Sequence, residues 1–276
     1  MKLALLPFAL AALGGCTFVA PSTAAGRLAL AAAQPSPDAV SLEIFFARFR
    51  YGDARVADDL WRQVDELQLP LEARRALAEA GFRVGLVGSQ PPAELVELLT
   101  LSERGRKSGE QGSRLDEDPR VNLRVLQTRA GRRNEVVASH TYASLPLLGK
   151  EGGQIVGRTF ADAECRFDLR VQPQADGRWE LSLAPEVHHG QPQTKYTGSE
   201  GVLRLESGKP KKTFDELKLV AHLQPGQMLL LTAAPDRPGT LGHYFFTEPV
   251  DDDVVQKLLV IRPTQATGDL LFAEKK

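Results

Sequence analysis

Metal-binding and acid–base side chains are present in the chain, but their spacing does not assemble a site. The five histidines are His140, His188, His189, His222 and His243, and none has a Cys or His partner at a zinc-binding interval. His188 and His189 are adjacent, so on a strand they would face opposite sides and could not hold one ion together. We interpret the histidines as surface or loop residues, and we predict no metal ion and no cofactor.

The other polar clusters are explained by loops and turns. Residues 251–253 are three aspartates that lack the spaced ligands, the central glycine and the final glutamate of an EF-hand. Residues 149–157 are glycine-rich but match no phosphate- or dinucleotide-binding loop, and a hairpin turn explains them better. Asp65 and Glu66 are neighbours on a predicted helix, where adjacent side chains diverge. No nucleophile elbow occurs, so we predict no catalytic residue and a protein that is not an enzyme.

The two cysteines stand in different contexts. Cys16 follows one positive charge (Lys2), an apolar run over residues 3–13 and two glycines, which together indicate a secretory signal. The run is shorter than the roughly 20 residues that span a bilayer. Cys165 lies between Phe160 and Phe167, and we predict a small buried core residue rather than a nucleophile.

Residues 13–16, Leu-Gly-Gly-Cys, resemble the bacterial lipobox. The resemblance implies that the Cys16 thiol is diacylated, that residues 1–16 form the signal region, and that the new amino group is acylated. Several acyl chains would hold the protein stably at a membrane. Thr17 stands where an aspartate would favour inner-membrane retention, so we predict an outer-membrane anchor facing the periplasm. The alternative is an ordinary signal peptide cut near Ala24 or Ala25.

Charge and composition exclude one class of partner. The chain has 34 Lys and Arg against 35 Asp and Glu, a net charge of −1 with neutral histidines. This balance gives no reason to expect nucleic-acid binding.

Apolar periodicity divides the chain into successive parts and predicts an α+β fold. Strand 41–49, helix 56–67, a helix opened by Pro70 and closed by Gly81, strand 82–86 and a helix after Pro92 give a β-α-α-β-α order. Later strands are expected near residues 121–125, 136–142, 155–160, 167–171, 179–183, 214–223, 227–232 and 257–261, with a tight turn at 176–177. We therefore predict a flexible tether 17–37, a small α/β module 38–101, a polar linker 102–118, a mostly antiparallel β domain 119–265 and a tail 266–276.

Two predicted strands, 227–232 and 257–261, are almost wholly apolar, so both of their faces need burial. Either the α/β module and a second sheet cover them within one chain, or neighbouring subunits do. Charged substitution at Leu230 or Leu259 would accordingly destroy either the fold or an assembly.

Five short segments resemble the C-terminal β domain of bacterial secretins, the ring-forming outer-membrane channels of secretion systems and type IV pili. They are residues 167–173, 179–186, 223–231, 241–246 and 257–263. The resemblance implies a secretin-like β domain and an assembly or transport role. The chain has space for one module before the β region, and residues 229–241 lack a clear gate sequence, so a secretin-like fold is implied more strongly than a channel.

The leading hypothesis is thus a non-enzymatic envelope lipoprotein with a structural or accessory role in outer-membrane secretion or assembly. Its expected partners are the membrane, through the lipid, and another copy of the chain or a secretion-machinery protein. The alternative is a lipid-anchored periplasmic module that binds a small ligand or an envelope polymer. An unrecognised hydrolase ranks third.

Overall fold

The computed structural model describes residues 38–105, 121–151, 154–199, 202–250 and 253–266. The described residues all belong to one compact unit. Cys16, the predicted signal region, the tether, and nearly all of the predicted linker and tail lie outside the described residues. Within the described ranges, no helix has both the length and the apolar character needed to cross a membrane.

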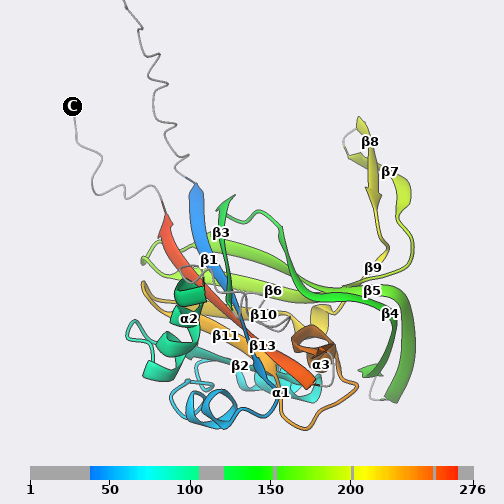
Figure 1. Cartoon of the computed structure of the whole chain (residues 1–276). Helices are drawn as coiled ribbons and strands as arrows, with labels where there is room; N and C mark the ends of the chain where they lie inside the picture. The colour runs from blue at the N-terminus through cyan, green and yellow to red at the C-terminus, as the bar shows by residue number, and fades with distance from the viewer. Residues whose placement is uncertain (1–37, 106–120, 152–153, 200–201, 251–252, 267–276) are drawn as a thin grey trace, which may run out of the picture. The chain divides into compact units, whose positions relative to one another are not determined.

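Most of the described elements are strands (Figure 1). The strands are β1 (Ala39–Arg50), β2 (Phe82–Val87), β3 (Val121–Arg129), β4 (Asn134–Glu151), β5 (Gln154–Pro173), β6 (Trp179–His188), β7 (Gln193–Ser199), β8 (Val202–Gly208), β9 (Lys211–Thr213), β10 (Leu219–Leu223), β11 (Met228–Ala233), β12 (Thr247–Val250) and β13 (Asp253–Ala266). The helical elements are a π-helical turn η1 (Arg55–Asp59), α1 (Leu71–Glu79), α2 (Ala93–Gly105), a 3-10 turn η3 (Asp215–Leu217) and α3 (Leu241–Phe246).

Sheet 1 is six-stranded, with the order β2-β11-β13-β1-β3 and with β12 also paired to β13. All of its pairings are antiparallel. Ile261 of β13 lies opposite Ile44 on one side and Leu229 on the other. The first strand of the chain therefore pairs with the last one.

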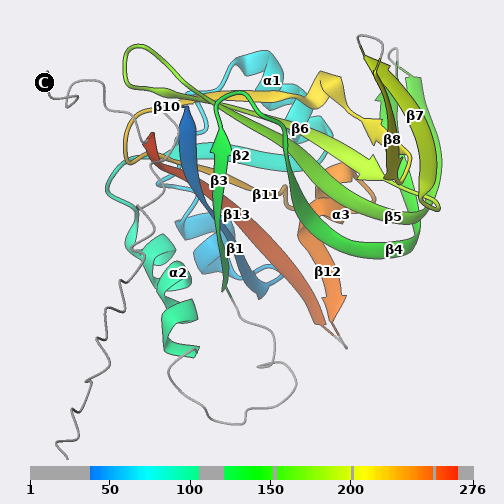
Figure 2. The same cartoon turned by 90° about the horizontal axis from the view of Figure 1, so that it is seen from above.

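Sheet 2 has the order β10-β6-β5-β4, with β9 also paired to β6. Its β4–β5 hairpin has strands of 18 and 20 residues and curves along its length (Figures 1 and 2). The register of β4 against β5 shifts between Val137 and Thr141, which marks a β-bulge. β7 and β8 pair only with each other among the described strands.

The main core lies between the two sheets. Alternate β5 residues, among them Phe167 and Leu169, point into it because side chains alternate across a strand. Phe82 from sheet 1 and Phe245 from α3 meet Phe167 there, with ring centroids 5.3 Å apart for Phe82–Phe245 and 4.6 Å apart for Phe167–Phe245. Tilted and edge-on rings at these distances attract each other beyond their apolar burial.

A second apolar cluster covers the opposite face of sheet 1. Side chains from α2 and from the segment beginning at η1, including Trp61 and Leu95, pack there against Leu230 and Val260. β11 is buried along its whole length, and residues 258–261 of β13 are fully buried. The apolar strands are thus covered on both faces within one chain, which decides the question that their sequence left open.

Two glycines allow the turn that follows α1 to lie directly against the start of α3. Gly81 has a φ of +84°, and a Cβ there would lie 1.9 Å from Oγ1 of Thr240. A Cβ on Gly242 would lie 2.0 Å from the carbonyl oxygen of Gly81. The Gly242 N–H donates to the Ala80 carbonyl at 2.9 Å. Only residues without side chains permit this approach, and Gly81 has the helix-ending role that was predicted for it.

The predicted division into an α/β module 38–101 and a separate β domain 119–265 is wrong. The elements of the module occur in nearly the predicted order, but β1 and β2 lie in the same sheet as β3, β11 and β13. Neither region would bury its sheet alone, because β11 and β13 lie between β2 and β1. The mostly antiparallel β character was predicted correctly.

Two element predictions also need correction. The helix expected over 56–67 is limited to η1 and the turns after it, and Asp65 instead forms an isolated β-bridge with Leu86. The strand expected over 214–223 is split into η3 and β10. A Cβ on Gly85 would lie 2.4 Å from the Val64 side chain, so the 64–66 segment lies directly against β2.

Candidate functional site

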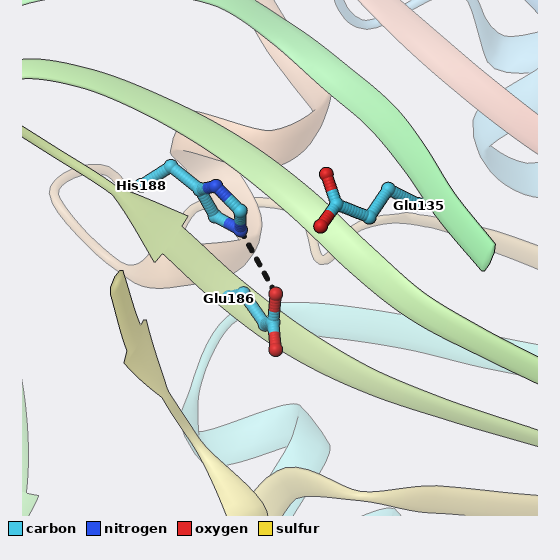
Figure 3. A group of neighbouring side chains, drawn as sticks. All are labelled: Glu135, Glu186 and His188. Carbon is cyan, nitrogen blue, oxygen red and sulfur yellow. Dashed lines mark hydrogen bonds and ion pairs between the residues drawn. The ribbon is translucent and has the colours of Figure 1, made fainter. Parts of the chain in front are cut away.

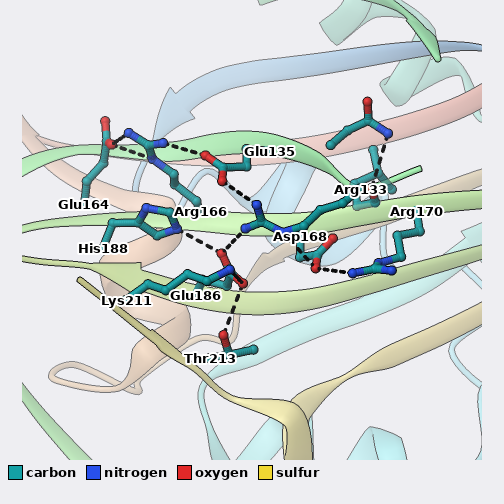
Figure 4. Close-up of polar contacts among 12 residues, drawn as sticks. Arg133, Glu135, Glu164, Arg166, Asp168, Arg170, Glu186, His188, Lys211 and Thr213 are labelled. Carbon is teal, nitrogen blue, oxygen red and sulfur yellow. Dashed lines mark hydrogen bonds and ion pairs between the residues drawn. The ribbon is translucent and has the colours of Figure 1, made fainter. Parts of the chain in front are cut away.

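The outer face of sheet 2 carries a cluster of charged and polar side chains, which we call the charge network. It consists of Arg133, Glu135, Glu164, Arg166, Asp168, Arg170, Glu186, His188, Lys211 and Thr213 (Figure 4). Charged residues alternate with core residues along β5, so they all face away from the core. The register places Glu186 opposite both Arg166 and Thr213, which gathers residues from β5, β6 and β9.

Glu186 is the buried centre of the network, with 1% of its side chain exposed. Its Oε2 accepts hydrogen bonds from Nη2 of Arg133 at 2.7 Å and pairs with Nε2 of His188 at 2.9 Å (Figure 3 shows the His188 contact). Its Oε1 accepts from Nζ of Lys211 at 2.8 Å and from the hydroxyl of Thr213 at 3.1 Å. Both oxygens are therefore fully used.

Two arginines connect Glu186 to the neighbouring carboxylates. Arg133 also donates to Glu135 at 2.7 Å and to Asp168 at 3.1 Å. Arg166 joins Glu135 at 2.7 Å and Glu164 at 2.7 Å. Oδ1 of Asp168 is a buried atom without a hydrogen-bond partner among the described residues. The network ties β4, β5, β6 and β9 together across the face of the sheet.

Lysine and arginine side chains surround the carboxylates of the network, and this arrangement favours the charged form of Glu135 and Glu186. Burial alone would raise the pKa of Glu186, but the hydrogen bonds from Lys211 and His188 and the charge of Arg133 lower that pKa to about 2. The pKa of Glu135 is also lowered, because bonds from Arg166 and Arg133 outweigh its burial. These carboxylates stay ionised at neutral pH and are poor general acids.

Glu135, Glu186 and His188 each offer one ligand atom, and these atoms lie within 4.8 Å of one another (Figure 3). The surroundings do not fit a metal ion, however. Arg133 donates to both carboxylates and Lys211 to one of them. A metal ion would have to displace these hydrogen bonds while it remained beside two positively charged side chains. The carboxylates are thus already neutralised by Arg133 and Lys211.

A second polar group lies at the β4 bulge, between the sheets. Lys257 has 8% of its side chain exposed, and its Nζ donates to the Ala138 carbonyl at 2.6 Å and to Glu248 at 3.3 Å. The Ser139 hydroxyl accepts from the Cys165 N–H at 2.9 Å. Burial raises the pKa of the Cys165 thiol to about 12 and lowers the pKa of Lys257. Cys165 is fully buried, as predicted, and a thiol of this pKa is a weak nucleophile.

The structure corrects the interpretation of the histidines. His188 is buried on β6 with Glu186, two residues away and on the same face, and is not a surface or loop residue. His189 is half-buried, with its ring centroid 5.0 Å from that of Phe160. The signal that would have found the cluster is the alternation of charge at residues 164–170 and at 186 and 188 on adjoining strands. Residues 251–252 and Cys16 lie outside the described residues.

One margin of sheet 1 is formed by β3, which pairs with β1 and with no other described strand, although α2 contacts it. Its side chains Leu123 and Val125 are 46% and 55% exposed. The opposite margin, β2, is closed by mutual backbone hydrogen bonds between Asp65 and Leu86 at 2.8 and 2.9 Å. In sheet 2, the edge strand β4 is contacted by the Gly239 loop and by α3. β3 is therefore a long edge strand with exposed apolar side chains.

No protein-family model and no curated protein matches the chain. Weak structural neighbours of the chain are secretin domains. One is the secretin-domain β-barrel of InvG from the Salmonella SPI-1 injectisome, at 14% identity and a TM-score of 0.23, covering 82% of this chain and 61% of that one. Another is the type II secretin GspD from enteropathogenic Escherichia coli, at 13% identity and a TM-score of 0.19, covering 82% and 65%. The chain thus spans less than two thirds of either neighbour, and scores at this level do not establish a common fold.

Proposed function

We propose that the chain is a non-enzymatic, lipid-anchored envelope protein whose β body associates with a second copy of itself, in a structural or accessory role in outer-membrane secretion or assembly. The observation that carries this proposal is the open, apolar edge of β3. An edge strand offers unpaired N–H and C=O groups, and strand addition satisfies them while burying the flanking side chains.

The sequence of β3 suits pairing with another β3. In a two-fold antiparallel pair centred on Val125, the two Val125 side chains face each other and Leu123 lies opposite Gln127. Arg124 then lies opposite Leu126, so like charges do not meet. A pair centred on Arg124 would place two guanidinium groups together, which is unfavourable. The residues of β3 thereby allow a second copy to pair in a register that brings no like charges together.

Light scattering on the mature chain without its lipid tests this association. Wild type should be larger than one chain, and Leu123→Lys should yield a folded monomer, because a charge at the new strand pair would be desolvated. Leu67→Lys is the matched control, since Leu67 is 76% exposed and lies away from β3. A wild-type monomer at high concentration would refute the proposal and favour the small-ligand or polymer-binding alternative.

The lipid anchor is tested separately. Labelled palmitate should enter the wild-type protein in a lipoprotein-competent bacterium, and Cys16→Ser should abolish both labelling and processing. Labelling that persists in Cys16→Ser, or its absence from wild type, would contradict the anchor without bearing on the β3 edge.

A further inference from the structure

A two-stranded arm, residues 193–208, extends from the end of sheet 2. It consists of β7 and β8, which pair with each other and with no other described strand. The chain enters the arm directly from β6 and leaves it into β9, and these two strands are themselves paired. In Figure 1 the arm leaves the paired ends of β6 and β9 and projects beyond the sheet. An unbroken ladder of backbone hydrogen bonds would make the arm a rigid extension of sheet 2.

The ladder is interrupted at the base of the arm. β6 pairs with β9 as far as His188 and Lys211, and β7 pairs with β8 from Gln193 and Gly208 onward. Four residues lie between these pairs on the first strand and two on the second, so the strands do not stay in register. A bulge of this kind bends a ladder and leaves some of its residues without a partner.

The same three-residue pattern, Gly-x-Pro, stands on both strands of this interruption. Residues 190–192 are Gly-Gln-Pro, and residues 208–210 are Gly-Lys-Pro. Proline has no N–H, so neither Pro192 nor Pro210 can donate to the ladder. Gly190 has a φ of +69°, a conformation that residues with a side chain rarely adopt. Both strands are therefore weakened at the same level, as a hinge requires.

The middle residue of each Gly-x-Pro segment bonds to one residue of β5, Asp162. The side-chain amide of Gln191 donates to Oδ2 of Asp162 at 3.0 Å, and Nζ of Lys209 donates to the Asp162 carbonyl at 2.8 Å. The Gly190 N–H donates to the carbonyl of the preceding residue, Ala161, at 2.7 Å. Asp162 has a φ of +49°, which is uncommon outside glycine and most often tolerated by Asn and Asp. The base of the arm is thus attached to a single bend of β5.

We propose that the arm is hinged and that Asp162 holds it in one direction. The arm turns about the two Gly-x-Pro segments when the bonds from Gln191 and Lys209 are broken, while sheet 2 stays folded. The hinge begins after His189, since its N–H still donates to the Pro210 carbonyl at 2.8 Å. A hydrogen bond shifts an equilibrium by roughly five-fold, so loss of both bonds should raise the released population on the order of twenty-fold. The hinge involves neither β3 nor the lipid anchor, so it can be tested separately from the proposed function.

Distance measurements between two spin labels by electron paramagnetic resonance test the hinge. One label is attached to the arm through Thr197→Cys and the other to sheet 2 through His222→Cys, an exposed position, in the mature chain with Cys16→Ser. Cys165 is fully buried and should remain unlabelled. Dilution with an excess of unlabelled chain restricts the measured distances to those within one chain. The protein with its native hinge should give one narrow distance distribution.

Paired substitutions separate the bonds to Asp162 from general effects. Gln191→Ala with Lys209→Met removes both side-chain bonds but leaves Asp162 and the hinge backbone unchanged, and should broaden the distribution at least two-fold. Gln193→Ala with Lys218→Met is the matched control, because both residues are exposed and the same side chains are changed away from Asp162. Urea unfolding should be alike in all three proteins, which shows that the body is intact. A broad distribution with the native hinge, or an equally narrow one in Gln191→Ala with Lys209→Met, would overturn the proposal.

Discussion

Replacing Glu186 by glutamine removes the negative centre of the charge network while nearly preserving its shape. The amide oxygen can still accept one bond, from Arg133 or Lys211. The amide nitrogen must then face a donor that is now 2.7 or 2.8 Å from a carboxylate oxygen. Removing one partner of a buried ion pair leaves the other charge uncompensated, which typically costs about 3–5 kcal/mol.

The lowered pKa of Glu186 gives a second value for the stabilisation that this carboxylate provides. In the folded protein this pKa is about 2, against an ordinary value of 4.5. Because the folded value is the lower one, the stabilisation is complete above pH 4.5 and is lost as pH falls through about 2. The interval corresponds to about 3 kcal/mol at 1.36 kcal/mol per pH unit. Near pH 3, about 2 kcal/mol of this should already be gone.

Urea unfolding of wild type and Glu186→Gln at pH 7, 5, 4 and 3 measures the effect. The variant should be less stable by about 3 kcal/mol at pH 7, and the difference should decrease steadily below pH 4.5. Glu216→Gln is the control, since Glu216 is exposed and its loss should change stability by less than about 0.5 kcal/mol. A difference that stays constant from pH 7 to pH 3 would refute the argument, because the loss would then not come from the carboxylate charge.

Three further outcomes are expected. Lys257→Met should lower the free energy of unfolding by no more than about 1 kcal/mol at pH 7, because Glu248 still pairs with Arg48 at 2.7 Å. Burial lowers the pKa of Lys257, so the folded protein loses this proton at a lower pH than the unfolded chain does. Wild type should therefore gain stability relative to the variant when urea unfolding is repeated at pH 10. Cys165 should resist a thiol reagent at pH 8 until urea unfolds the protein, because its pKa is raised to about 12; rapid labelling of the folded chain would contradict this. Elemental analysis of protein purified without chelators should give no stoichiometric metal, and zinc at one equivalent would show that the network opens to admit it.

Local patterns in the sequence were sufficient to predict most elements, because periodicity and turn chemistry are local properties. Alternation at Phe167, Leu169 and Val171 correctly indicated a strand with one buried face. The turn at Gly177 has the positive φ of +80° that a tight hairpin needs. The domain boundary was wrong because β1 pairs with β13, more than two hundred residues away. The apolar composition of a strand predicts that both of its faces are buried, but it does not identify the segment that buries them.

The charge network was missed for a related reason. Glu186 and His188 are two residues apart, a spacing that places them on one face of a strand. Arg133 and Lys211 reach them from the residue before β4 and from β9, whose registers no local pattern reveals. Spacing rules for metal sites search for ligands near each other in sequence. This cluster is assembled instead from strands that pair across the sheet.

The apolar strands β11 and β13 are not available to bind another subunit. Their sequence left open that neighbouring subunits bury their two apolar faces, but α2, the η1 segment and sheet 2 already cover those faces. A charge at Leu230 or Leu259, each fully buried, would therefore act on the fold and could not report on assembly. β3 is different, because no described strand pairs with its outer edge and its Leu123 and Val125 side chains are already exposed. A substitution at Leu123 or Val125 alters the surface that a second copy would contact, but it removes no contact in the core of sheet 1. For this reason an assembly surface can be tested at the β3 edge and not in the apolar centre of sheet 1.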